Sequence, residues 1–154
     1  MEEVGITPRK RAKVTAGITE RVTTGCGYLY VTVNSDEHGM CEVFSSLGKA
    51  GGCASAQLEA TCRLISLALR SGIEPAAIVK HLRGIRCPSI AWEEGHAVLS
   101  CADAIGSVLE KHMSGESVNL VTAASSTGQC PDCGGMLVYE EGCHHCPGCG
   151  YTKC

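Results

Sequence analysis

The sequence predicts an α+β protein: a small antiparallel sheet packed with two to three helices, followed by a C-terminal zinc ribbon. Three observations lead to this fold class. Apolar and polar residues alternate in GYLYVTVN, which starts at Gly27 and has the pattern of a half-buried strand. Apolar residues recur at helical spacing between Cys53 and Leu69. Two Cys-x-x-Cys pairs, CPDC and CPGC, stand close together near the C-terminus, with the spacing of metal-binding turns.

Composition limits the function. The 154 residues have a formal net charge of −3 and only 4% aromatic residues, which argues against nucleic-acid binding through a basic field or stacked bases. There is no secretory signal and no apolar run of membrane-spanning length, so a cytoplasmic protein without membrane contact is expected. Twelve cysteines in such a protein favour metal binding and redox chemistry over a disulfide framework.

The chain begins with a basic segment and a predicted hairpin. Residues 1–20 lack amphipathic periodicity and are expected to form a flexible basic arm. The main α+β domain is placed at 21–113. Its first strand lies in 27–34, and the turn-rich NSDEHG leads to a second strand, MCEVFSSL, at 40–47.

Three helices are expected to follow. The first covers 53–72 and ends at a glycine; the second lies in 74–84, with Pro75 in its first turn. The third begins at Ser100, which with Asp103 forms a capping box. Residues 114–127 are small and polar, as in a linker. The inward faces are Leu58, Cys62, Ile65 and Leu69 in the first helix, and Ile105, Val108, Leu109 and His112 in the third.

The zinc ribbon is assigned to 128–154, which contains six cysteines for a site that needs four. One alternative uses Cys130, Cys133, Cys146 and Cys149 as ligands and leaves Cys143 and Cys154 over. The other takes Cys143 and Cys146 as the second pair, which leaves Cys149 and Cys154. The glycine after Cys149 favours the first. In both, the leftover thiols are either idle surface thiols or candidates for thiol exchange, since a cysteine on a free chain end can move and nearby zinc or Lys153 can lower its pKa.

Four cysteines of the main domain stand beside glycine, proline or a helix start, where turns rather than core positions are expected. They are candidates for a second thiolate metal site, holding zinc or an iron–sulfur cluster. The structural alternative is that they are small buried hydrophobes, as Cys41 and Cys62 are expected to be. The four are Cys26, Cys53, Cys87 and Cys101.

Several segments together resemble a known family. TGCGYLYVTVN, EVFSSLGKAGGCASAQLEA, RLISLALRSGIEPAAIVKHLRGIRCPS, LSCADAI, CPDCGGMLVYEEGC and CGYTKC are similar to the C-terminal region of adenosylcobalamin-dependent (class II) ribonucleotide reductases, the TSCPD domain with its zinc-ribbon tail. The resemblance covers about residues 8–154. The motif that names the domain reads LSCAD here, with Leu99 in place of threonine and Ala102 in place of proline. A helix's first turn accepts either alanine or proline, so the fold is expected to be kept.

The resemblance implies a redox role for the tail. In the family, a cysteine pair near the C-terminus re-reduces the active-site disulfide and is itself reset by a thioredoxin-like reductant. Here that pair would be Cys143 and Cys154, or Cys149 and Cys154 in the other alternative, which has the C-x-x-x-x-C spacing of reductase tails.

The reductase barrel, with its radical cysteine and cobalamin pocket, has no counterpart in these 154 residues. The chain is therefore expected to be inactive alone and to dock on a separate catalytic subunit that binds adenosylcobalamin. The substrate of that subunit would be a ribonucleoside di- or triphosphate. The competing hypotheses are a zinc-ribbon module that contacts nucleic acid or a regulatory partner, and a purely structural adaptor.

Overall fold

The computed structural model describes residues 5–48, 51–114, 130, 132–133, 138–140 and 143–153. The chain divides into two compact units, with the boundary in the sequence between Ser114 and Gly115. The first unit has an antiparallel sheet of three strands in the order β1-β2-β3. The predicted linker at 114–127 lies, except for its first residue, outside the described residues. The strands of this sheet are β1 (Ala16–Thr24), β2 (Gly27–Asp36) and β3 (Gly39–Leu47).

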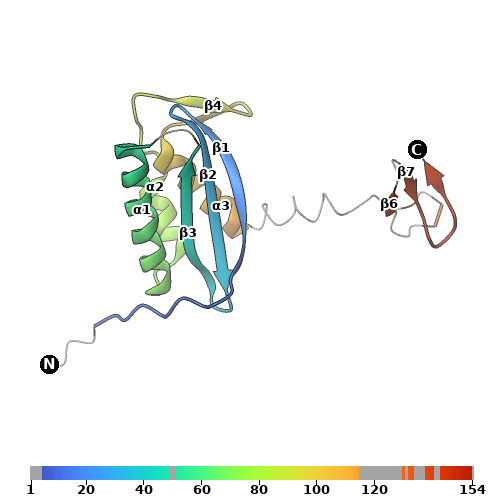
Figure 1. The fold of residues 1–154 in the computed structure, drawn as a ribbon, viewed down its shortest axis with the longest axis horizontal. Coiled ribbons are helices and arrows are strands. Elements are labelled where there is room, and N and C mark those ends of the chain that lie inside the picture. Colours follow the sequence, from blue (N-terminus) through green and yellow to red (C-terminus); the bar gives the residue numbers. More distant parts are fainter. Residues whose placement is uncertain are drawn as a thin grey trace. The chain divides into compact units, whose positions relative to one another are not determined.

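Three helices lie on one face of the sheet (Figure 1). Helix α1 (Cys53–Arg70) packs on β3, helix α3 (Cys101–Ser114) packs on β2 and β1, and α2 (Pro75–Leu82) packs on α3. Strand β2 is central, and its inward side chains are fully buried because helices cover them. The predicted inward face of α1 is confirmed. The core includes Leu29, Val31, Val33, Leu58, Cys62, Ile65, Leu69, Ile105, Val108 and Leu109.

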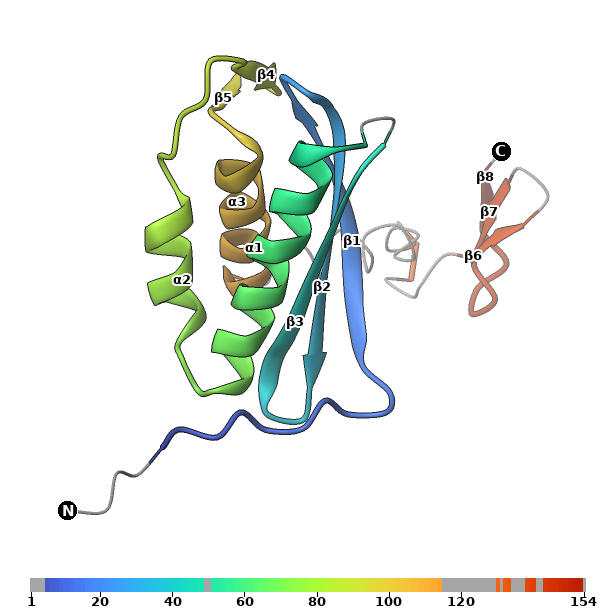
Figure 2. The same cartoon turned by 60° about the vertical axis from the view of Figure 1, so that its left-hand side comes forward.

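Between α2 and α3 the chain forms a short hairpin of β4 (Ala91–Glu93) and β5 (His96–Val98). Its turn has positive φ at Glu94 (49°) and Gly95 (81°), as in the tight turns that match strand twist. The hairpin lies at the end of the domain where α1 and α3 begin (Figure 2). It is held to β1 by the Glu93 carboxylate, which accepts hydrogen bonds from the backbone N–H and the hydroxyl of Thr23 at 3.0 and 2.8 Å.

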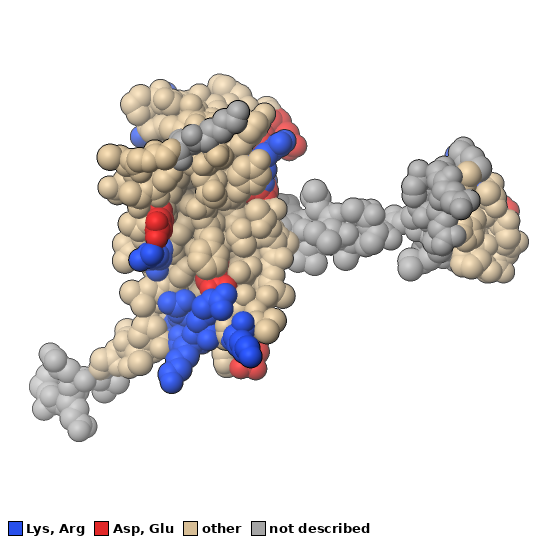
Figure 3. Space-filling model, in the orientation of Figure 1, with Lys and Arg blue, Asp and Glu red and all other residues tan. Residues whose placement is uncertain are grey.

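The N-terminal segment differs from the predicted flexible arm over 1–20. Strand β1 already starts at Ala16, and Arg9 is fixed against the domain. Its guanidinium pairs with Asp36 at 3.0 and 3.1 Å and donates to the carbonyls of Met40 and Leu69. Basic side chains gather at this end of the domain (Figure 3), and carboxylates partly neutralise their charge. The arm is therefore a strap across the ends of the strands and α1.

Glu42 lies under this strap and is 1% exposed. Arg11 donates to it at 2.6 and 2.9 Å, Asn34 at 2.9 Å and Thr15 at 3.1 Å. Burial by itself raises the pKa of Glu42, but these hydrogen bonds outweigh burial and hold the pKa below its ordinary 4.5. Asp36, hydrogen-bonded by Arg9, also has a lowered pKa. Both carboxylates are therefore more stable ionised in the folded state than in the unfolded chain.

Acid is expected to destabilise the domain through these two groups. A lowered folded pKa gives stability that is complete above the unfolded value and is lost as pH falls through the folded one, so the free energy of unfolding should decline below about pH 4.5. Glu42→Gln should cost about 1–3 kcal/mol at pH 7 and flatten that decline. Urea unfolding at pH 7 and 3.5 measures both. Glu59→Gln, in an exposed pair with Arg63, is the control and should change stability by less than about 0.5 kcal/mol.

The second unit has a small sheet in the order β6-β7-β8, as a zinc ribbon requires. Strand β6 (Val138–Glu140) pairs with β7 (Cys143–His145), and β7 pairs with β8 (Thr152–Lys153). The antiparallel sheet with three helices, followed by a small unit with clustered cysteines, confirms the predicted fold class. Of the helices in the described residues, none combines the length and apolar character needed to cross a membrane.

Candidate metal centre

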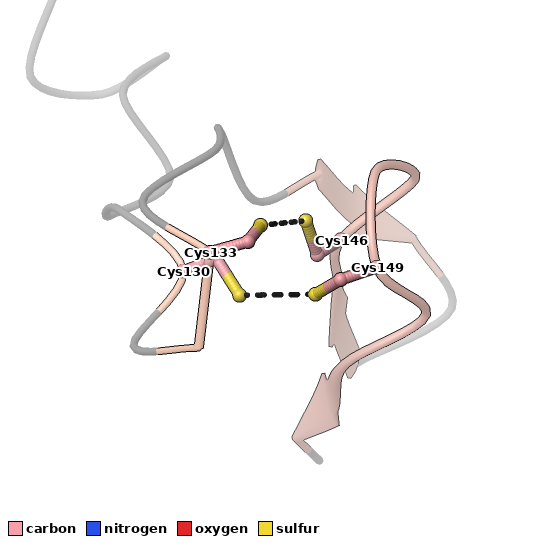
Figure 4. Close-up of side chains that lie close together, drawn as sticks. All are labelled: Cys130, Cys133, Cys146 and Cys149. Carbon is pink, nitrogen blue, oxygen red and sulfur yellow. Dashed lines mark hydrogen bonds between the residues drawn. The ribbon is translucent and has the colours of Figure 1, made fainter.

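Four cysteines of the second unit converge on one point (Figure 4). The sulfurs of Cys130, Cys133, Cys146 and Cys149 all lie within 4.8 Å of one another. Cys130 faces Cys149 and Cys133 faces Cys146, each with sulfurs 3.5 Å apart. Tetrahedral zinc with Zn–S bonds near 2.3 Å places its sulfurs about 3.8 Å apart. The cluster therefore fits a single zinc ion with four thiolate ligands.

The chain turns tightly around the second pair. After β7, the N–H of Cys146 donates to Tyr151 O at 2.7 Å and the N–H of Gly150 donates to Cys146 O at 2.9 Å. Gly150 has φ 81°, a left-handed conformation that glycine adopts without a steric penalty. This turn brings the sulfurs of Cys146 and Cys149 to the same side. It also explains why a glycine directly after the pair indicated a metal-binding turn.

The two thiols of the second pair differ in pKa. The backbone N–H of Cys149, helped by Cys133 and Gly148, lowers the pKa of Cys146 to about 7. At Cys149 the backbone N–H of Tyr151 acts in the lowering direction, but the neighbouring thiols outweigh it and raise the pKa to about 12. Four thiolates this close repel one another, and a divalent cation offsets that repulsion. The donor set is soft, which favours zinc over harder cations.

The two cysteines left over by this ligand set differ in position. Cys143 is half-buried on β7, is disulfide-bonded, and is not part of the cluster. Cys154 lies outside the described residues. The geometry therefore brings together the first set of ligands considered from the sequence, with Cys149 rather than Cys143 as the fourth. Sequence spacing could not separate the two, because both stand three residues from Cys146.

The candidate cysteines of the main domain do not form a comparable cluster of sulfurs. Among the described residues, the ribbon cluster is the one group of three or more His, Cys, Asp and Glu side chains close enough to hold a metal ion. Cys26 lies in the β1–β2 turn and Cys53 at the start of α1, both exposed; Cys87 and Cys101 are half-buried. The second metal site stays a prediction. By contrast Cys41 and Cys62 are core thiols, with pKa values raised by burial.

Two further residues organise this region and were not recognised from the sequence as doing so. Thr24 is 5% exposed, and its hydroxyl lies between Cys26 and Cys101. Asp103 was expected only to complete a helix cap. The cap is present, since the Asp103 N–H donates to Ser100 Oγ at 3.0 Å, but the carboxylate binds the loop before the helix. A capping box indicates such an aspartate; nothing in the spacing indicates Thr24.

Comparison with protein families matches the TSCPD domain over residues 6–113, which is most of the chain. Searches of curated proteins and of solved structures found no match. The match covers the strap, the three-stranded sheet, the three helices and the main-domain cysteines, and it ends before the ribbon. On this match, the chain belongs to the TSCPD domain family.

Proposed function

We propose that this chain is a component of an adenosylcobalamin-dependent ribonucleotide reductase. It docks on a separate catalytic subunit and re-reduces that subunit's active-site disulfide through Cys143 and Cys154. The observation that supports this most directly is that Cys143 is disulfide-bonded and stands outside the four-cysteine cluster. A cysteine that is not needed for zinc is available for exchange.

We assign Cys154 as the second thiol of this pair, because the resemblance to reductase tails implies a redox pair that includes it. Of the cysteines that the structure describes, ten are free thiols and Cys143 is disulfide-bonded.

The proposed exchange conserves atoms and electrons. In the dithiol form, one thiolate of the pair attacks the catalytic disulfide and forms a mixed disulfide, releasing one catalytic thiolate that takes up a proton. The second thiol of the pair then displaces the other catalytic sulfur. The catalytic cysteines end as two thiols and the tail as a disulfide. A thioredoxin-like dithiol returns the tail to the reduced form.

The remaining parts have supporting roles in this proposal. Zinc holds the ribbon folded, and with it the strand β7 that contains Cys143. Adenosylcobalamin generates the radical on the catalytic subunit, and we assign none of its binding to this chain. The net charge of −3 and the ion pairs of Arg9 and Arg11 weigh against the alternative of a nucleic-acid-binding module.

Turnover of the reconstituted reductase tests the role of the pair. Cys143→Ser and Cys154→Ser should each lower thioredoxin-dependent ribonucleotide reduction by about tenfold or more, because the exchange cannot be completed with one thiol. Dithiothreitol reduces the catalytic disulfide directly and should restore the rate, which shows that the subunits still assemble. Unchanged thioredoxin-dependent turnover in both variants would eliminate the redox role and leave a structural adaptor. Failure to bind the catalytic subunit would eliminate the reductase assignment itself.

A further inference from the structure

Three cysteines that are far apart in the sequence lie near one another in the first unit, since Cys26 and Cys87 both act on the thiol of Cys101. Cys26 is in the β1–β2 turn and Cys101 is the first residue of α3. The hydroxyl of Thr24 links them: it accepts from the backbone N–H of Cys26 at 3.3 Å and from Cys101 Sγ at 3.8 Å. The buried threonine therefore fixes the β1–β2 turn against the start of α3.

The loop that contains Cys87 is attached to the same place. The Cys87 N–H donates to Leu99 O at 3.0 Å, which ties the loop to the residues just before α3. Gly25 packs directly on the backbone of Ser89, since a Cβ atom on Gly25 would lie only 2.0 Å from Ser89 O. The two cysteine-bearing segments are thus in backbone contact, and no side chain at position 25 could separate them without shifting the loop.

Two neighbouring thiols act on Cys101. Burial raises the pKa of Cys101; the Thr24 hydroxyl acts against this, while Cys26 and Cys87 raise the pKa further. Such mutual repulsion between ionised sulfurs is what a bound cation relieves. The side chains that act on the thiol of Cys101 are the hydroxyl of Thr24 and the thiols of Cys26 and Cys87.

Cys53 provides a fourth sulfur. It is exposed, it is the first residue of α1, and it follows Gly52, whose φ is 78°. Upstream, the N–H of Gly48 donates to Tyr28 O at 3.0 Å, which anchors the connection beside the first residues of β2. Tyr28 is two residues from Cys26, so the connection to α1 starts next to the β1–β2 turn.

We propose that Cys26, Cys87 and Cys101, completed by Cys53, form a second thiolate metal centre that binds zinc or an iron–sulfur cluster. The sulfurs do not yet stand within reach of one ion. Cys87 Sγ now donates to Ser89 O at 3.3 Å, and rotation to another staggered rotamer releases it from that carbonyl. Thiolates are suitable ligands for zinc and for an iron–sulfur cluster. Either centre would join the β1–β2 turn, the loop that contains Cys87 and the first residues of α1 and α3.

Metal content of the full chain, purified without oxygen from medium containing zinc and iron, tests this centre. We expect metal beyond the ribbon's single zinc: either a second zinc, or iron with equimolar sulfide and visible sulfur-to-iron absorbance. The double variant Cys26→Ser/Cys101→Ser should lose that second centre and keep the ribbon zinc. Cys130→Ser/Cys133→Ser should lose the ribbon zinc and keep the second centre. Cys62→Ser is the matched control, since its buried thiol donates to Ser45 Oγ at 3.1 Å and a hydroxyl can make the same hydrogen bond.

Alkylation of the native protein is a second measurement, which does not depend on a variant that could lose metal by misfolding. With the second centre filled, Cys26, Cys87 and Cys101 should resist an alkylating reagent until a chelator is added, whereas an empty site leaves the exposed Cys26 reactive at once. The proposal is wrong if the full chain holds only the ribbon zinc while these three thiols react freely. A Cys26–Cys101 disulfide in the anaerobically purified chain, or equal metal content in the full chain and the Cys26→Ser/Cys101→Ser variant, would also overturn it.

Discussion

Chelation of zinc under reducing conditions is expected to unfold the C-terminal unit and leave the first unit folded. The second unit has strands of only two or three residues, and its buried described side chains are the ligands Cys130 and Cys146. Modules this small gain too little from a hydrophobic core to fold unaided. Structural zinc in comparable peptides contributes about 10–16 kcal/mol of apparent binding free energy. Loss of zinc therefore removes most of what holds the ribbon together.

The measurement is amide hydrogen exchange, residue by residue, before and after a zinc chelator. Amides of 143–153 should lose protection, including those of Cys146 and Gly150, whose hydrogen bonds close the turn. Amides in β2 and α3 should keep theirs. Cys146→Ser should imitate the chelator. Cys143→Ser is the matched control, because it removes a cysteine three residues away that is not a ligand, and it should retain zinc. A ribbon that stays protected after verified zinc removal would show that packing, not metal, stabilises it.

The first unit could be predicted where local pattern and burial agree. Leu58, Cys62, Ile65 and Leu69 recur at helical spacing, and the structure buries all four in α1. Strand β2 alternates cleanly because helices cover one face. Strand β1 was missed: it is at the edge of the sheet, and Glu20 and Arg21 interrupt its apolar pattern. Those residues are explained by tertiary partners, since Glu20 pairs with Lys111 at 2.6 Å and Arg21 lies over the ring of Tyr28.

The ribbon cluster could be predicted from the sequence because its ligands come in two pairs of neighbouring cysteines. Each ligand pair is closed by one local turn, so spacing alone indicates it. The choice between Cys143 and Cys149 depends on where β7 begins, which is a tertiary fact. For the main-domain thiols, spacing in the sequence does not indicate which of them are neighbours in the structure. Cys26 and Cys101 are 75 positions apart, and only the packing of the β1–β2 turn on α3 makes them neighbours through Thr24.

Asp103→Ala is expected to be the most damaging single substitution in the first unit outside the apolar core. Asp103 is 3% exposed, and its carboxylate accepts three hydrogen bonds: from Arg83 Nη1 at 2.8 Å, from Gly84 N at 3.0 Å and from Leu99 N at 3.2 Å. Removing it leaves two backbone N–H groups and a guanidinium without their acceptor. Arg83 is 40% exposed, so water compensates part of the loss. We expect a cost of about 2–4 kcal/mol, a large share of the roughly 5–15 kcal/mol that stabilises a typical domain.

Glu110→Gln is the matched control for Asp103→Ala, because Glu110 pairs with the same arginine at 3.3 Å but is 60% exposed. Its substitution should cost less than about 1 kcal/mol. Urea unfolding followed by circular dichroism compares the two, and equal midpoints would show that the buried acceptor is not needed. Asp103 also fixes the segment from Arg83 to Leu99 that contains Cys87. If the second metal centre exists, Asp103→Ala should weaken metal retention there while the ribbon keeps its zinc, because only the loop bearing Cys87 has lost its anchor.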